Sequence, residues 1–296
     1  MTDYLFLVLA AAMLAIDFAI SKLYQSRAGT GLTAGFAFNA LLGLFTAVLF
    51  FAIGGFTFPV SGYSVWMAFL ISALSMTYTL VGFRILRAGS MALYSLFLMT
   101  GGMALPYVWG LLFLDEPFSW VRTAGLLLLI CAVALSNLPS KKNRLNLWLL
   151  LGCVAVFILN GFVSVVSKLH QINTEYLSVD TTHFVMLGGI CKCFLSGIAY
   201  LCATFYKHQK AKTIPKTPLS RSLLPLIALS AVIGGVSYLL QLIGAKNLPA
   251  TVLYPFITGG SMICSSIVGI VCFKEKISRR LAFCILLCFM GTLLFL

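Results

Sequence analysis

Two ionisable residues lie in the middle of long apolar stretches of this 296-residue chain. Asp17 is flanked by LAAAMLAI and FAI, and Lys192 lies in GGICKCFLSG, about ten residues, or about 15 Å of helix, from either end of its apolar run. Burying a charge in lipid is costly even on lenient scales, so each side chain needs a partner or a wet cavity. Either the two residues form a structural ion pair, or they bind or gate a charged or zwitterionic solute, or one of them lies nearer the end of its stretch.

Three amide side chains also interrupt apolar stretches: Asn39, Asn160 and Gln241. Within a membrane, a buried amide forms hydrogen bonds between helices as readily as it binds a ligand. We therefore treat each of the three both as a candidate solute contact and as a candidate link between helices.

The elements that position these residues follow from composition. The chain is 61% hydrophobic and only 9% charged, which leaves too little polar surface to cover a soluble globule. About 20 apolar residues are needed to cross a bilayer as a helix. Ten stretches meet this need, and the chain is predicted to be an all-α integral membrane protein with ten transmembrane helices: residues 4–23, 32–51, 63–86, 91–113, 120–138, 145–169, 182–205, 223–243, 250–273 and 278–296.

An internal repeat divides these spans into two sets of five. Residues 92–116 and 252–275 both have Leu-Tyr near the start, Thr-Gly-Gly in the middle and an acidic turn at the end, at Glu116 or Glu275. The first span of each half also ends alike, with SKLYQ from Ser21 and SKLHQ from Ser167. Because five is odd, the second half runs in the opposite direction across the membrane. We predict two inverted five-helix repeats, residues 1–140 and 141–296.

Four tyrosines are related by this repeat. Tyr94 corresponds to Tyr254 in the repeated stretch, and Tyr78 corresponds to Tyr238 at the same offset. Tyrosines near span ends commonly form the interfacial belt. These four can instead serve as the amphipathic walls of a cavity, and they are candidate solute contacts for that reason.

The basic residues predict an orientation. Of the 20 Lys and Arg residues, 16 fall on one side of the ten-span topology and three, Arg122, Lys168 and Lys246, fall on the other. The positive-inside rule places the basic side, including residues 206–222, in the cytoplasm of a cell membrane and both termini outside. The net charge of +13 then indicates contact with anionic lipids rather than with nucleic acid.

The doubled turn is similar to that of a known family. The sequence LDEPFS (114–119) in the first half and FKEKIS (273–278) in the second are each followed by a helix with a small residue in its first turns, Gly125 or Ala282. This pattern and the span count resemble the EamA-like ten-helix transporters of the drug/metabolite transporter superfamily. The resemblance implies secondary transport of small organic solutes, such as metabolites, amino acids or drug-like molecules, by alternating access around a central cavity. Coupling to protons, and assembly as a monomer or a homodimer, stay open.

Motifs for other chemistry are absent from the sequence. There is no phosphate-binding Gly-Lys-Ser/Thr loop, and the three histidines have no metal-site spacing, so we expect no ATP-driven step, metal, cofactor or enzyme activity. We expect Glu116 and Glu275 to cap helices and to join the two halves rather than to catalyse. A passive channel, a lipid scramblase and a polytopic lipid-modifying enzyme remain alternatives.

Overall fold

The chain folds into a bundle of α-helices, seen in a computed structural model that describes residues 2–29, 31–87, 91–136, 147–211, 221–273 and 279–296. The described residues form ten α-helices and one short 3₁₀ turn, Arg221–Leu223. The helices are α1 Thr2–Ala28, α2 Leu32–Ile53, α3 Gly62–Arg87, α4 Met91–Phe113, α5 Trp120–Ser136, α6 Leu147–Ile172, α7 Thr181–Ala211, α8 Leu224–Asn247, α9 Ala250–Phe273 and α10 Arg279–Leu293.

Eight of these helices are long and apolar enough to cross a membrane, and the exceptions are α5 and α10. With 17 and 15 residues, α5 and α10 extend about 25 Å and 22 Å, short of the roughly 30 Å hydrocarbon core. Helix α5 begins only at Trp120, where the Ser119 hydroxyl accepts the Arg122 N–H, and α10 ends before a final turn at Leu294. The prediction of an all-helical, multi-pass membrane protein is therefore confirmed, with two shorter helices among the ten expected spans.

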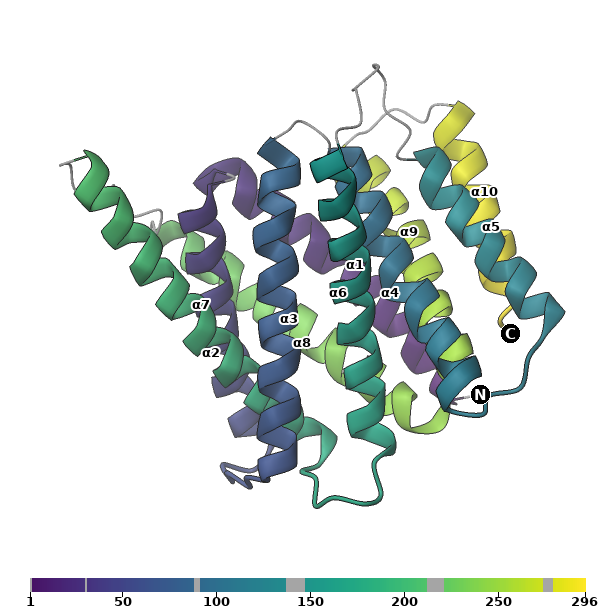
Figure 1. Cartoon of the computed structure of the whole chain (residues 1–296), viewed down its shortest axis with the longest axis horizontal. Helices are drawn as coiled ribbons and strands as arrows, with labels where there is room; N and C mark the ends of the chain where they lie inside the picture. The colour runs from purple at the N-terminus through teal and green to yellow at the C-terminus, as the bar shows by residue number, and fades with distance from the viewer. Residues whose placement is uncertain (1, 30, 88–90, 137–146, 212–220, 274–278) are drawn as a thin grey trace.

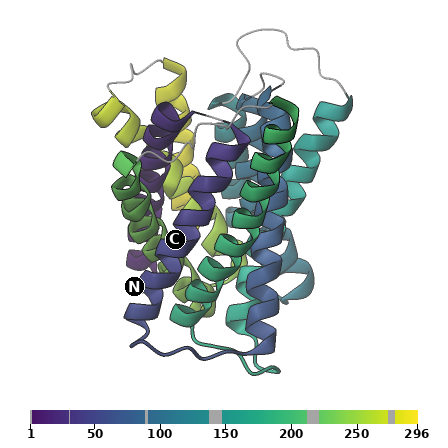
Figure 2. The same cartoon turned by 90° about the vertical axis from the view of Figure 1, so that its left-hand side faces the viewer.

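Two closely packed pairs of helices stand at opposite ends of the bundle, and the other helices lie between them. Helix α2 packs against α7 at one end of the long axis, and α5 packs against α10 at the other (Figure 1). Between them, α1 packs on α8 and α9, and α6 packs on α3 and α4. Figure 2, viewed from the α2 and α7 end, shows these two helices side by side.

Glycines allow α2 and α7 to touch backbone to backbone. A Cβ atom on Gly43 would lie 2.6 Å from both Gly189 O and Cys193 N, and one on Gly189 would lie 2.8 Å from both Gly43 O and Ala47 N. Each glycine thus meets the other glycine and the residue four positions beyond it. The two helices make equivalent contacts with one another, a close approach that only small residues permit.

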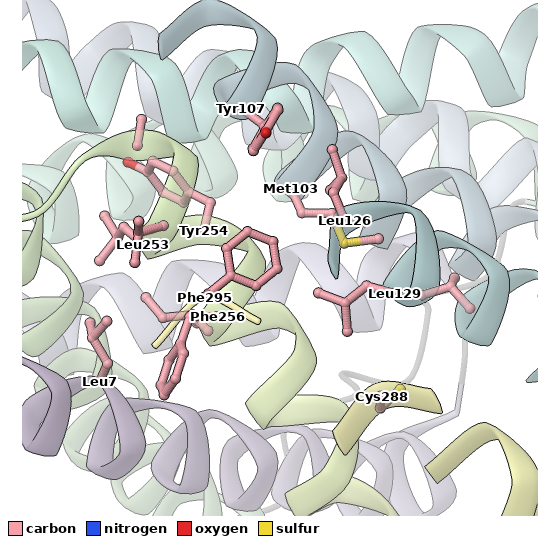
Figure 3. Packing of buried hydrophobic residues seen from close by; sticks show 14 of the residues in the cluster. Leu7, Met103, Tyr107, Leu126, Leu129, Leu253, Tyr254, Phe256, Cys288 and Phe295 are labelled. Atoms are coloured by element: carbon pink, nitrogen blue, oxygen red, sulfur yellow. The ribbon is translucent and has the colours of Figure 1, made fainter. Parts of the chain in front are cut away.

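The largest apolar core gathers around the beginning of α9. Leu253, Tyr254 and Phe256 of α9 pack with Met103 of α4 and Leu129 of α5, among other buried residues (Figure 3). This core anchors the first turns of α9 between the two halves of the chain.

The connections 54–61 and 173–180 lie at the same end of the bundle, the lower end in Figure 1. The Ser61 hydroxyl donates a hydrogen bond to Leu177 O, which ties the two connections together. The N-terminus belongs to this end as well, since Asn247 Nδ2 donates to Asp3 Oδ1 at 2.9 Å. We call this the outer end, because the charge distribution predicts that it faces out; residues 212–220 of the expected cytoplasmic loop lie outside the described residues.

Candidate functional site

A cavity of about 450 Å³, mainly apolar with polar groups set into its wall, lies inside the bundle. It is lined by α1 to α4 and α6 to α9, whereas α5 and α10 contribute no lining residue among those described. Its volume falls within the range of about 300–1,000 Å³ typical of small-molecule sites. Seven of the nine candidate contacts named from the sequence line it: Asp17, Tyr78, Asn160, Lys192, Tyr238, Gln241 and Tyr254.

Asp17 reaches the cavity from α1 and is held against α8. Its Oδ1 atom accepts a hydrogen bond from the Ser230 hydroxyl. A Cβ atom on Gly234, one turn further along α8, would lie 3.0 Å from Asp17 Oδ2. A glycine at this position therefore leaves room for the carboxylate, and Ser230 fixes its orientation.

Lys192 reaches the cavity from α7, one residue before Cys193, which abuts Gly43 of α2. Within the described part of the chain, its ammonium group makes no hydrogen bond and no ion pair within 4.0 Å, including none with Asp17. The direct structural pair is thus not formed in this structure. The donors of Lys192 are available to the cavity.

Tyr238 and Tyr254 are both fixed to α6. The Tyr238 hydroxyl lies 2.9 Å from the Ser167 hydroxyl, and the Tyr254 hydroxyl donates to Ser164 O at 2.5 Å. Their rings therefore form part of the cavity wall in defined positions rather than an interfacial belt.

Asn160 serves as a link between helices while it lines the cavity. Its Nδ2 atom donates to Leu98 O of α4 at 2.7 Å. One turn along α6, the Ser164 hydroxyl lies 3.4 Å from Gly102 O, the carbonyl that Pro106 leaves without its usual intrahelical N–H partner. The proline in α4 is thus accommodated beside the cavity, where α6 supplies the missing donor.

Gln241 and its neighbour Ser237 link α8 to α1. Gln241 Nε2 donates to the Ser237 hydroxyl at 3.2 Å, and this hydroxyl donates to Ala10 O at 2.8 Å. The Gln241 amide therefore has one fixed contact and lines the cavity at its outer part.

Two candidates lie elsewhere. Asn39 is not among the lining residues, because it stands one turn nearer the start of α2 than Gly43, beyond the lined part of that helix. Tyr94 packs on α3 instead, where a Cβ atom on Gly82 would lie 2.4 Å from its ring. Tyr94 therefore does not line the cavity although its repeat-related counterpart Tyr254 does, because Gly82 has no side chain and leaves space on α3 for the Tyr94 ring.

Hydroxyl groups that the sequence did not single out supply much of the polar lining. They come from α2, α3, α6, α8 and α9: Thr46, Ser72, Ser75, Ser164, Ser167, Ser230, Thr258 and Ser261. Their spacing could have identified some of these residues from the sequence. Ser72 and Ser75 stand three residues apart and share a helix face, and so do Ser164 and Ser167.

His170 lies at the outer end of α6 and is buried in a stack of rings. Its ring centroid lies 3.5 Å from that of Phe184, a cavity-lining residue, and 5.7 Å from that of Tyr63, which stacks in turn on Tyr176 at 5.2 Å. His170 Nε2 lies 2.9 Å from the Ser64 hydroxyl. The stack therefore runs from Tyr176 in the connection 173–180 to Phe184 on the cavity wall.

Comparison with known proteins establishes the fold alone. No family model and no curated protein matches the chain. A solved structure described only as "Crystal structure of protein" has a TM-score of 0.76, with 97% of this chain and 94% of that chain covered. At 17% sequence identity, that structure shares the architecture over nearly the whole length of both chains.

Proposed function

We propose that this protein is a secondary transporter that moves a small organic solute across the membrane by alternating access, and that the cavity is its solute site. The observation that carries the proposal is the cavity itself: it measures about 450 Å³ and is lined by eight helices, with Asp17 and Lys192 on its wall and no ion pair between them. Ionisable groups within the spans of a membrane protein commonly face a cavity and mark solute or ion pathways.

The packing of the helices supports two inverted repeats. Exchanging α1 with α6, and each following helix with the one five places on, turns the α1–α8 contact into α6–α3 and the α1–α9 contact into α6–α4, and both members of each pair are present. The same exchange turns the α2–α7, α4–α9 and α5–α10 contacts into themselves. The equivalent approaches of Gly43 and Gly189 fit an axis that passes between α2 and α7. A solute site between inverted halves is typical of secondary transporters.

The roles of the two charged residues follow from their surroundings. Lys192 offers free ammonium donors and would bind an anionic group of the solute. Asp17, whose carboxylate already accepts from Ser230, would bind an amine of the solute or take up a coupling proton. The smaller hydroxyl groups and the tyrosines would complete the polar contacts around an otherwise apolar wall.

The contacts among Asp180, His183 and Thr57 at the outer end favour a second candidate function, that of an enzyme. Asp180 contacts His183 Nδ1, and His183 Nε2 lies 2.9 Å from the Thr57 hydroxyl, an order that resembles a catalytic triad. However, Thr57 Oγ1 also donates to Gly54 O at 2.7 Å at the end of α2, and the Asp180 carboxylate accepts the Thr182 N–H at the start of α7. These contacts cap helix ends, so we favour the transporter over a membrane enzyme.

Flux measurements in proteoliposomes test the proposal and separate a carrier from a channel. The purified protein is reconstituted, and uptake is followed for a panel of charged, zwitterionic and neutral metabolites. A carrier gives flux that saturates with solute concentration and is accelerated by solute on the opposite side. Flux that rises linearly with concentration, or lipid scrambling without solute flux, would point to the alternatives and reject the carrier.

A further inference from the structure

The turn that joins α8 to α9 at the outer end is held by a carboxylate from another part of the chain. Glu116, in the connection between α4 and α5, accepts the Ala250 N–H on Oε1 at 2.6 Å and the Thr251 N–H on Oε2 at 2.8 Å. N–H groups in the first turn of a helix have no intrahelical partner, and a negative charge there is favoured by the helix dipole. The expectation that Glu116 caps a helix is confirmed, and that helix follows residue 140, whereas Glu275 lies outside the described residues.

A buried ammonium group holds the other side of the same turn. Lys168 Nζ of α6 donates to Ala245 O and Leu248 O at 2.6 Å each, where α8 ends. The Lys168 side chain is only 5% exposed, although the sequence placed it among the few basic residues of the outer side. A cation at the carboxyl end of a helix complements its dipole. We call Glu116, Lys168 and their four backbone partners, Ala245, Leu248, Ala250 and Thr251, the outer clasp.

The first turn of α9 depends on this clasp more than an ordinary helix start would. Pro255 lacks an N–H group, so the carbonyl of Thr251 loses its usual partner one turn along. The Thr251 hydroxyl is also buried without a hydrogen-bond partner in the described structure. The first turn therefore has one intrahelical hydrogen bond fewer than an ordinary helix start, and Glu116 accepts its first two N–H groups.

The clasp is connected to the cavity through α6. The segment that carries Lys168 also carries Ser167, which contacts the Tyr238 hydroxyl, and Ser164, whose carbonyl accepts from Tyr254. Tyr254 lies in the clasped first turns of α9, and both tyrosines line the cavity. Moving the turn away from α6 would therefore displace both tyrosines from the outer part of the cavity.

We propose that Glu116 and Lys168 are positioning residues of the outer gate: Glu116 holds the α8–α9 turn against the α4–α5 connection and Lys168 holds it against α6, and the cavity opens to the outer side when this clasp releases. The gate rests on the proposed function, since it controls the passage of a solute. The clasp joins the two halves of the chain, because Glu116 lies before residue 140 and its partners, Ala250 and Thr251, lie after residue 140. A contact that bridges the halves is the kind that alternating access must break and remake.

Thiol labelling from each side of the membrane tests the gate without any solute. Ser75→Cys, near the middle of α3 on the cavity wall, reports access to the cavity, and Leu177→Cys, which is 84% exposed, marks the outer side. The probe is a membrane-impermeant maleimide applied to proteoliposomes of defined orientation. The labelling rate of the same protein without Ser75→Cys gives the background from the native cysteines.

Glu116→Gln is the variant, and Asp115→Asn is its matched control. Gln keeps one acceptor oxygen but presents an amide NH₂ group to the second N–H. The control substitution removes an equal negative charge from Asp115, an exposed side chain that forms neither of these hydrogen bonds. We expect Glu116→Gln to raise labelling of Ser75→Cys from the outer side about tenfold, the effect of losing one charge-assisted hydrogen bond, and to lower it from the opposite side. Asp115→Asn should leave both rates unchanged.

Lys168→Gln gives an independent second test with the same expectation. Its control is Lys246→Gln, which removes the same charge from an exposed side chain of α8 that makes none of the clasp hydrogen bonds. Unchanged outer labelling in both clasp variants would overturn the gate, and so would equal increases from both sides, which indicate general loss of structure. The two proposals can fail separately. A labelling shift in a protein that carries no solute rejects the transporter, whereas saturable flux without a labelling shift rejects the clasp as its gate.

Discussion

Asp17 and Lys192 face one cavity from α1 and α7, and no ion pair within 4.0 Å joins them. Buried opposite charges are ordinarily paired directly, because an isolated charge is costly to remove from water. Here Ser230 supports the carboxylate, and the ammonium group has no partner within hydrogen-bonding distance among the residues that the structure describes. A separated pair of opposite charges leaves room for a solute that carries groups of both signs or of either sign.

The first prediction concerns Lys192. Lys192→Met keeps most of the side chain's volume and removes its charge, and a charge-assisted hydrogen bond is worth roughly 1.5–3 kcal/mol. We expect solute flux to fall at least about tenfold while the protein remains folded in the membrane. Flux in proteoliposomes and elution as a single species in detergent measure the two effects. Near-normal flux in this variant would end the proposal that Lys192 binds the solute.

The second prediction uses Asp17 to separate solute binding from a structural pair. Because the two residues do not touch, Asp17→Asn should lose flux with little loss of thermal stability, and its amide oxygen can still accept from Ser230. In a double-mutant cycle with Lys192→Met, we expect a coupling energy below about 1 kcal/mol, because the two opposite charges attract across the cavity but share no hydrogen bond. Recovery of stability in the double variant, relative to the single variants, would instead establish a structural pair.

The helices could be predicted closely because turn residues bound the apolar runs. Helices α4 and α9 begin and end at the expected residues. Helix α7 was expected to end at 205 but continues to Ala211, since polar residues such as Lys207 can extend a helix beyond the lipid. Apolarity marks the part of a helix that lies in lipid and not the end of its hydrogen-bonding pattern.

The charged residues of the candidate site could be predicted from the sequence, because burying a charge has a large free-energy cost, whereas the hydroxyl residues could not. Asp17 and Lys192 stood out because a charge within an apolar run needs an explanation. Serines did not, because a hydroxyl can satisfy itself on its own helix, as Ser75 does by donating to Ile71 O at 2.6 Å. Lys168 was counted only as a charge of the outer side, because a lysine near a span end usually extends to the interface, whereas this one turns inward to the carbonyls of α8.

The third prediction tests the contact between α2 and α7. Gly189→Ala would place a Cβ atom 2.8 Å from Gly43 O and Ala47 N, which are backbone atoms and can move only if the helices separate. We expect a loss of about 1–3 kcal/mol, the usual cost of overpacking. Gly197→Ala on the same helix is the control, because its Cβ atom meets nothing within 4 Å and alanine favours the helix. Thermal unfolding in detergent compares them; equal unfolding midpoints would contradict the close contact.

The fourth prediction is the topology. The excess of Lys and Arg on one side predicts that the C-terminus and the connection 173–180 face out. In intact cells, Leu177→Cys should react with an impermeant thiol reagent, and a reporter fused to the C-terminus should be active only if it functions outside the cytoplasm. A cytoplasmic C-terminus would reverse the orientation and with it the assignment of the outer end.

The last prediction concerns Asp180, which precedes α7 at the outer end. Partial burial, the strongest single influence, raises the pKa of this carboxyl, but the hydrogen bond and charge of His183 and the backbone N–H groups of Thr182 and His183 together lower it below 3.8. A depressed pKa means that the folded state binds the proton less tightly than the unfolded state, so the stabilisation is present above pH 3.8 and is lost as the pH falls through the folded-state pKa.

Asp180→Asn should therefore unfold at a lower temperature than the wild type at pH 6, and the difference should close toward pH 3. Glu175→Gln, in the same exposed connection, should follow the wild-type profile; a gap between Asp180→Asn and the wild type that stays constant across this range would show that the carboxylate charge contributes nothing.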